Sequence, residues 1–439
     1  MSATHDQPAP FLRRRTHSFG LVLGLCLAVV GTALSGTAAW AQKGTSTEDA
    51  GEREAVEFDQ SALRFDAGLQ AAIDTLSARD GLAPDESFVL AAAHFLRGIE
   101  IAFQSRYRHG VTNSITAIAV MRLGLPPNPQ PEPFTGAVIE TLFLDLETHM
   151  DAARDVLATI DDDASFSIPL DIASLWLDVN ADGTAQPGEN LLQLTGAVFG
   201  GRQARGALEQ MTGQLIVDFD QSDAAWLNAY THLISGTGDL VLALQPADII
   251  DAVFADGAEL DALHQGRLEG WMADGPRTVD TVLSWILVLE QTPDADHTRS
   301  ARENMLAMIA SNRIFWERVG AETDNGREWI PAPQQTSALP VTFPGEVGPQ
   351  WLAILDDLEA LLEGEVLAPH WRLGGLDGSH GINIRTFLEN PQSMDLLGLI
   401  HGRGVLFAVE EGPIISTANW QAFQSLVGRQ GGFFPFLLN

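Results

Sequence analysis

Residues 85–107 read DESFVLAAAHFLRGIEIAFQSRY, and their large apolar side chains recur at the spacing of one helix face. Phe88 and Phe95 stand seven residues apart on this stripe, with further apolar residues at intervals of four. Asp85 or Ser87 is suited to cap the first turn, because a side-chain oxygen there can accept a backbone N–H. We therefore expect a helix that packs one face into a core.

Patterns of the same kind recur along the chain. Further helices are predicted at residues 61–78, 115–123, 135–160, 224–244, 247–254, 260–271, 279–289, 298–319, 351–362 and 418–427, with weaker helical character at 191–211. The segment 279–289 is very apolar, so we expect it at the centre of the core. Residues 321–347 read as a proline-containing, loop-rich connection, and the apolar tail 433–438 is expected to dock on the body.

Two short segments have the pattern of strands. Residues 166–172 read FSIPLDI and alternate apolar with polar residues, and Pro169 within them indicates an edge strand. Residues 215–219, LIVDF, also have strand character, and the two segments are expected to pair. The sequence thus predicts a mainly α fold, in which a helical domain carries a minor two-stranded β element flanking one loop.

That loop, residues 178–189, reads DVNADGTAQPGE. Oxygen-bearing side chains stand at its positions 1, 3 and 5, Gly183 follows at position 6, and Glu189 closes it at position 12. The spacing resembles the calcium-binding loop of the EF-hand family. Ca²⁺ takes roughly 6–8 oxygens at about 2.3–2.6 Å, which a tight loop of this kind can supply. The resemblance is confined to these twelve residues.

The resemblance implies Ca²⁺ as the cofactor and a specific set of ligands. Side-chain oxygens would come from the first three positions, a backbone carbonyl from position 7, a direct or water-mediated contact from position 9 and two oxygens from position 12, that is from Asp178, Asn180, Asp182, Thr184, Gln186 and Glu189. The alternative interpretation is a surface turn, since Asp, Asn and Gly also favour turns.

Several features depart from a paired EF-hand. Position 8 is Ala185, where paired loops carry a β-branched apolar residue, and no second loop of this pattern occurs. Pro187 and Gly188 stand where the exiting helix would begin, and a predicted strand precedes the loop. We therefore expect a strand–loop–short helix site for a structural calcium ion, with a dissociation constant on the order of 10⁻⁴–10⁻³ M.

The N-terminal segment has the pattern of an export signal. Three arginines at 13–15 precede an apolar run at 19–30, and Ala39-Trp-Ala41 offers a cleavage site. We expect a signal peptide over 1–41, a flexible leader over 42–56, and a periplasmic or secreted protein with no stable membrane anchor after cleavage. An uncleaved N-terminal helix is the alternative. Cys26 is the only cysteine, so cleavage would leave no disulfide and no cysteine-ligated metal.

The composition limits the partners. The formal net charge is −33, which disfavours binding to nucleic acid and to anionic lipid surfaces. Solubility explains the acidic excess, and diffuse calcium buffering is the alternative explanation. Hydrophobic residues make up 45% of the chain, enough for a substantial core. A protein or small-molecule partner is not identified by these features.

The domain organisation is predicted from the same patterns. We expect a helical domain at 57–330 that contains the calcium loop, and a C-terminal helical and loop region at 331–439 packed on the same domain. A single continuous domain is preferred over two domains divided near 321–347.

A second cluster of residues could carry chemistry. Residues 313–331 concentrate carboxylates and tryptophans, namely Trp316, Glu317, Glu322, Asp324, Glu328 and Trp329. Paired acids beside tryptophans are typical of carbohydrate-acting sites, so an exported hydrolase is the alternative function. A solvated helix end with ion pairs explains the same residues. The leading prediction is an exported calcium-binding protein whose wider role is binding or scaffolding. A third hypothesis is an interaction protein that holds a basic partner on its acidic surface.

The histidines and aromatic residues elsewhere do not form a recognisable site. No H-E-x-x-H pattern is present, and His94 lies in an apolar helical run where packing is its expected role. Trp226 and Tyr230 are four residues apart and are expected to form one packed aromatic face.

Overall fold

A computed structural model describes residues 67–111, 124–198, 215–264, 271–339, 342–393, 395–428 and 437–438 of the chain. The predicted signal peptide (1–41), the leader (42–56) and the helix at 115–123 lie outside the described residues. Most of the weakly helical segment at 191–211 and of the tail at 433–438 lies outside them as well. Among the described residues, no helix combines the length and apolar character needed to cross a lipid bilayer.

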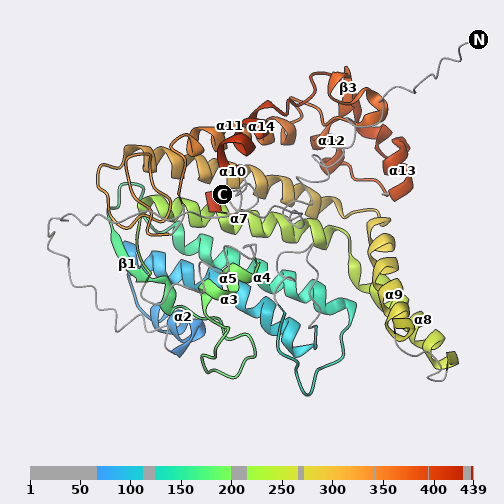
Figure 1. The fold of residues 1–439 in the computed structure, drawn as a ribbon, viewed down its shortest axis with the longest axis horizontal. Coiled ribbons are helices and arrows are strands. Elements are labelled where there is room, and N and C mark those ends of the chain that lie inside the picture. The colour runs from blue at the N-terminus through green and yellow to red at the C-terminus, as the bar shows by residue number, and fades with distance from the viewer. Residues whose placement is uncertain are drawn as a thin grey trace, which may run out of the picture.

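Four long helices form the body of the molecule. Figure 1 shows them side by side, with α4 between α3 and α7 and with α7 packed along α10. Their bounds are α3 Pro84–Arg108, α4 Gly136–Leu157, α7 Gln221–Ala243 and α10 Ala295–Ala321. All four coincide closely with predicted helices, so the mainly α fold class is confirmed. The Asp220 side chain caps α7 as its sequence suggests, because it accepts the backbone N–H groups of Ser222 and Asp223.

Shorter elements surround this body. The other α-helices are α2 Leu69–Ser77, α5 Leu191–Val198, α8 Pro246–His264, α9 Trp271–Leu289, α11 Val347–Leu362, α12 Ile384–Glu389, α13 Leu396–His401 and α14 Ala418–Val427. Short 3-10 turns are η4 Ile172–Ser174, η5 Trp371–Leu373, η6 Gly375–Asp377 and η7 Arg403–Ala408. In Figure 1, α11 to α14 lie on the α10 side of the body, and α2 lies on the α3 side.

The predicted two-stranded β element is present beside the loop. Strand β1 (Ser167–Asp171) pairs antiparallel with β2 (Ile216–Asp220), and Pro169 lies opposite Asp218. The backbone oxygen of Leu215 also accepts the N–H of Ile172, which extends the pairing. A second antiparallel pair, β3 (His380–Ile382) with β4 (Val409–Glu411), was not predicted, because three-residue strands leave too little alternation to detect.

The main core lies between the long helices and continues under α11 and α14. Its fully buried side chains include Leu76, Val89, Ile168, Ile309, Phe315, Leu355, Phe423 and Leu438. Trp226 and Tyr230 form the expected aromatic pair, with ring centroids 4.8 Å apart. His94 on α3 faces His149 on α4, with 3.3 Å between their Nδ1 atoms, and burial lowers the pKa of both imidazoles. His94 thus lies in the contact between two packed helices, as expected.

Two predictions about the segment 246–289 are wrong. Helix α8 runs continuously through residues 255–259, which were expected to separate two helices at 247–254 and 260–271. Gly257 in this stretch makes room for α9, since a Cβ atom there would stand 2.4 Å from a carboxylate oxygen of Asp280.

Helix α9 is also not central to the core. Its side chains at Val279 and Val282 are 63% and 52% exposed, and Leu283 and Trp285 are exposed as well. Figure 1 shows α8 and α9 extending beyond the end of the four-helix body, where α9 packs against α8. Apolar content identified the helix, but it does not show how many of its faces are covered.

Candidate metal centre

The loop 178–189 is closed at its base by its own two arms. Trp176 and Asn190 form an antiparallel bridge, and the N–H of Leu177 donates to the carbonyl of Glu189 at 2.9 Å. The N–H of Leu191 donates in turn to Leu175 at 2.9 Å. The loop therefore follows β1 and η4 and leads directly into the short helix α5, in agreement with the predicted order of strand, loop and short helix.

Apolar side chains anchor the start of the loop. Leu177 and Val179 are 1% and 3% exposed, and they pack in a small cluster with Leu69 of α2, Phe103 of α3 and Leu194 of α5. Asp178 lies between these two buried neighbours. Because successive residues of an extended segment point in opposite directions, burying both neighbours turns the Asp178 side chain toward the loop.

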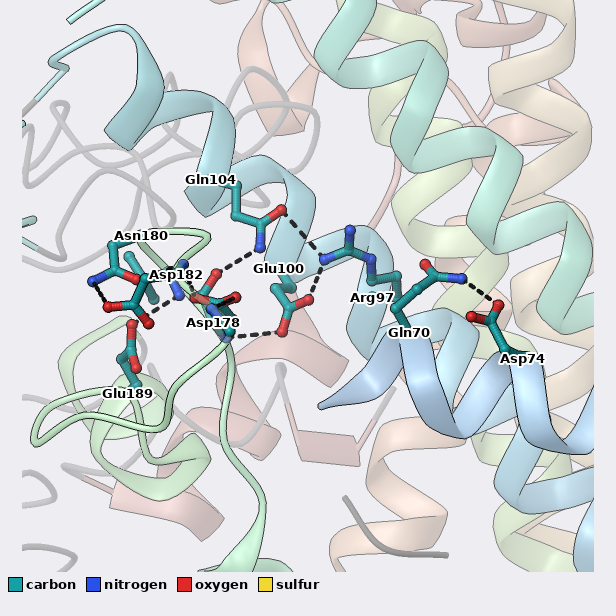
Figure 2. A network of polar contacts seen from close by, with 11 residues as sticks. Gln70, Asp74, Arg97, Glu100, Gln104, Asp178, Asn180, Asp182 and Glu189 are labelled. Carbon is teal, nitrogen blue, oxygen red and sulfur yellow. Dashed lines mark hydrogen bonds and ion pairs between the residues drawn. The ribbon is translucent and has the colours of Figure 1, made fainter. Parts of the chain in front are cut away.

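The side chains at positions 1, 3 and 5 organise the loop through hydrogen bonds. One carboxylate oxygen of Asp178 accepts the N–H of Asp182 at 3.1 Å, and the other accepts the N–H of Gly183 at 2.9 Å. The Asn180 amide donates to the Asp182 carboxylate, and its oxygen accepts the N–H of Asp182, each at 3.1 Å. The Asp182 carboxylate accepts the N–H of Thr184 at 2.9 Å. The Gln186 amide also donates to the Asp182 carboxylate. Figure 2 shows Asp178, Asn180 and Asp182 grouped on the inner side of the loop.

The backbone of the loop adopts left-handed conformations at two places in the first half. Gly183 has φ of 73°, as expected for the position that allows the sharp turn. Ala181 has φ of 58°, which is uncommon for a residue with a side chain and costs roughly 1–2 kcal/mol. The hydrogen bonds of Asp178 and Asn180 across this turn hold Ala181 in that conformation.

Glu189 at the end of the loop is buried and turned inward. It is 6% exposed, and its two oxygens accept the N–H groups of Val179 at 3.0 Å and Gln186 at 2.9 Å. Burial raises the pKa of this carboxyl, and the nearby Asp178 carboxylate adds to the rise. Among the described residues, the hydrogen bonds that Glu189 receives come from backbone N–H groups of its own loop.

These observations bring the predicted ligands into one loop but do not assemble a finished cage. Hydrogen bonds link Asp178, Asn180, Asp182 and Gln186 within the turn, and Glu189 reaches back toward its start. Within the described part of the chain, no three Asp, Glu, His or Cys side chains are grouped closely enough to hold a metal ion. The carboxylate oxygens are engaged with N–H groups of the loop instead. The donor set consists of oxygens alone, which fits a hard cation such as Ca²⁺.

Residues of α3 that contact the loop were not identified from the sequence. Glu100 and Gln104 both bind the backbone of Asp178, and Arg97 contacts both of these side chains. The nearest signal is Glu100 itself, a charged residue between Ile99 and Ile101 in an otherwise apolar helix, where a buried charge needs a partner. Its partner in the loop lies 78 residues away, so sequence spacing gives no indication of it.

The residues of the alternative site are distributed differently. Glu317 and Asp324 are exposed, whereas Glu322 and Glu328 are turned toward the start of α7. Trp329 packs against Phe219 of β2 with ring centroids 5.9 Å apart. The tryptophan and the carboxylates therefore do not share one pocket.

A cavity of about 580 Å³ does lie beside this region, between the end of α10, the loop before α11 and the start of α11. Trp316 and Pro331 line it, together with residues such as Leu339 and Phe343, and none of its lining residues is charged. The four carboxylates of the hydrolase hypothesis do not reach it, so the geometry offers that hypothesis no pair of acids flanking a pocket. Arg313 forms ion pairs with Asp356 and Glu359 of α11, each at 2.6 Å, as the ion-pair interpretation expects.

Comparison with protein-family models, with curated protein sequences and with solved structures found no match to this chain.

Proposed function

We propose that this protein binds one structural calcium ion in the loop 178–189, in the manner of an isolated EF-hand loop. The ligands would be side-chain oxygens of Asp178, Asn180, Asp182 and Glu189, the carbonyl of Thr184, and Gln186 directly or through water. A bound Ca²⁺ would supply positive charge to a turn that carries three carboxylates. The wider role, on this proposal, is binding or scaffolding outside the cytoplasm after export.

The observation that carries the proposal is the position of Glu189. A buried carboxylate is costly unless it is paired, and among the described residues this one receives hydrogen bonds only from backbone N–H groups of the loop. The Asp178 carboxylate, from the opposite end of the loop, is near enough to raise its pKa further. Two carboxylates that face the same turn, with no ion pair to a basic side chain in the described part of the chain, favour a cation between them.

Two further observations support an ion rather than a plain surface turn. The left-handed backbone at Ala181 is strained, and strain of this kind concentrates where a function requires it. The arms of the loop pair with each other at Trp176 and Asn190, which supplies locally the closure that paired EF-hand loops obtain from a sister loop. An isolated, locally closed loop fits a structural ion of modest affinity, on the order of 10⁻⁴–10⁻³ M.

Isothermal titration calorimetry of the purified protein with CaCl₂ tests this proposal. We expect a single site in the stated affinity range for the parent protein, and loss of measurable binding in Asp178→Ala, because position 1 contributes both an ion ligand and the hydrogen bonds to Asp182 and Gly183. Thermal unfolding with and without Ca²⁺ gives an independent readout, since a ligand that binds only the folded state raises the melting temperature.

Asp163→Ala is the matched control. Asp163 is an exposed acid in the run 161–163, outside the loop, so its removal makes the net charge less negative by the same amount without touching the site. Equal binding by both variants would indicate diffuse attraction of Ca²⁺ to an acidic surface. A parent protein that gives neither heat nor a shift in melting temperature with millimolar Ca²⁺ would refute the proposal.

A further inference from the structure

Three side chains on consecutive turns of α3 form a polar group that faces the start of the loop. Arg97, Glu100 and Gln104, which we call the α3 clamp, stand at i, i+3 and i+7 on one helix face. Glu100 is 2% exposed and Gln104 8% exposed, while the Arg97 side chain is 18% exposed. A charged residue is rarely as buried as Glu100, and the contacts of Glu100 account for its burial.

The α3 clamp holds both backbone polar groups of a single loop residue. A carboxylate oxygen of Glu100 accepts the N–H of Asp178 at 2.8 Å, and the amide of Gln104 donates to the Asp178 carbonyl at 2.7 Å. Arg97 donates to the other oxygen of Glu100 and, at 3.3 Å, to the side-chain oxygen of Gln104. Figure 2 shows Glu100 and Gln104 next to Asp178, with Arg97 on their far side.

This arrangement fixes the direction of the Asp178 side chain. With its N–H and its carbonyl both held by one rigid helix, residue 178 cannot rotate without breaking two buried hydrogen bonds, each costly to leave unmade. Its carboxylate is in turn the acceptor for the N–H groups of Asp182 and Gly183. The α3 clamp therefore sets the geometry of the first half of the loop by holding the backbone of its first residue.

We propose that the α3 clamp is the positioning element of the calcium site, so that Glu100 and Gln104 set the affinity of the loop for Ca²⁺ without touching the ion. This inference rests on the proposed calcium function. Outer residues that orient metal ligands typically contribute 10–100-fold to metal affinity. Because coupling between two sites is reciprocal, Ca²⁺ in the loop would also stabilise the turn of α3 that carries Glu100 and Gln104.

Calcium affinities of four variants test the inference, measured by calorimetry on the full chain. Glu100→Ala and Gln104→Ala are each expected to weaken Ca²⁺ binding about 10–100-fold. Glu100→Gln keeps an acceptor for the Asp178 N–H and is expected to recover most of the loss. Gln70→Ala is the control, because Gln70 is an exposed glutamine of the adjacent α2 whose amide donates to Asp74 of its own helix at 2.9 Å.

A second readout separates positioning from general stability. Hydrogen exchange at residues 100–104 is expected to slow when Ca²⁺ is added to the parent protein, and to be unaffected by Ca²⁺ in Asp178→Ala. A clamp that merely stabilises the fold would instead lower the melting temperature of the calcium-free variants and leave their calcium affinity unchanged.

The possible outcomes distinguish this inference from the proposed function. If the parent binds Ca²⁺ and both alanine variants bind within about twofold of it, the α3 clamp has no positioning role while the calcium site stands. If the parent does not bind, both proposals fail together. Should Glu100→Ala fail to fold, Gln104→Ala and Glu100→Gln decide the question, because each retains the Arg97–Glu100 contact or an uncharged substitute for it.

Discussion

Four acidic side chains meet at the start of α7, where single residues give the clearest pH dependence. Asp220 and Asp223 cap the helix reciprocally, Glu322 binds the hydroxyl of Ser222, and Glu328 accepts the N–H of Gly326 at 2.8 Å. Burial and mutual repulsion raise the pKa of Asp220 to about 6 and that of Glu328 to about 7, and they raise the pKa of Asp223 strongly. The folded protein thus holds protons here that the unfolded chain releases near pH 4.

This difference predicts that the group loses stabilising effect as the pH rises. Below about pH 4 these carboxyls are protonated in both the folded and the unfolded state, and their contribution to the free energy of unfolding is complete. That contribution is lost as the pH rises from there through about 6 and 7, where the folded state must release protons from buried positions. Glu328→Gln, which keeps an acceptor for Gly326, is expected to gain stability relative to the parent from pH 4 to pH 8, on the order of 1 kcal/mol or more. Urea unfolding at several pH values measures this difference.

Glu317→Gln serves as the comparison for that experiment. Glu317 is an exposed residue of α10 outside the group of four, so Glu317→Gln controls for the loss of one carboxylate. If the stability difference of Glu328→Gln does not change between pH 4 and 8, the raised pKa values of the group are wrong.

Individual residues were predictable only where their roles depend on fixed local spacing. The positions of Asp178 and Gly183 within the turn followed from the motif, and the structure places their hydrogen bonds and positive φ accordingly. Glu100 and Gln104 were not foreseen, because their contact with residue 178 depends on how α3 packs against the loop. Neither the sequence nor the structure tests whether the loop holds an ion, so this stays a prediction.

Among the contacts between helices, that of α4 with α8 leaves no room for a side chain at Gly136. The first residue of α4, Gly136, lies against the backbone of Ala247, and a Cβ atom there would stand 2.2 Å from the Ala247 carbonyl oxygen. The Gly136 N–H also donates to the Asp251 carboxylate at 2.7 Å. Since both partners are parts of rigid helix ends, neither has a flexible side chain that could yield.

Gly136→Ala is therefore expected to destabilise the protein by about 1–3 kcal/mol or more, as overpacking does when the backbone must shift. Gly320→Ala is the matched control with the opposite sign. Gly320 lies near the end of α10, and a Cβ atom there meets nothing within 4 Å, so alanine should stabilise by roughly 0.5–1 kcal/mol. Chemical unfolding of both variants gives the comparison, and a Gly136→Ala protein as stable as the parent would show that α8 docks elsewhere.

Among the elements, the sequence predicted which segments form helices better than it predicted which elements those helices pack against. Periodicity located α3, α7, α10 and α14 closely, because one buried face leaves a repeating apolar pattern. It divided α8 between residues 254 and 260 and assigned α9 to the core. Both errors concern the partner of a helix face, and an isolated helix pattern carries no information about that partner.

The net charge of −33 acts on the molecule as a whole. Self-repulsion of so many carboxylates opposes the compact state, and salt shortens its range to about 10 Å at 0.1 M. We expect NaCl to raise the melting temperature by several degrees between 10 mM and 0.5 M. A melting temperature independent of NaCl would indicate that local ion pairs already offset this repulsion.

Calcium is expected to stabilise the folded protein by more than this screening effect. At 10 mM Ca²⁺ and a dissociation constant of about 10⁻⁴ M, binding to the folded state alone adds about 2.7 kcal/mol. Thermal scans with CaCl₂ and with NaCl at equal ionic strength separate the two effects, and MgCl₂ tests whether the added effect is selective for Ca²⁺.

The two ends of the α8–α9 hairpin meet at the body. The N–H of Asp294, which precedes α10, donates to the carbonyl of Ala243 at the end of α7 at 2.7 Å. A segment whose exit lies one hydrogen bond from its entrance spans almost no distance, so closing the gap after its excision requires only a short turn. Excision of residues 244–293 would therefore leave the ends of α7 and α10 adjacent, although it would also remove the face of α8 that packs on α4.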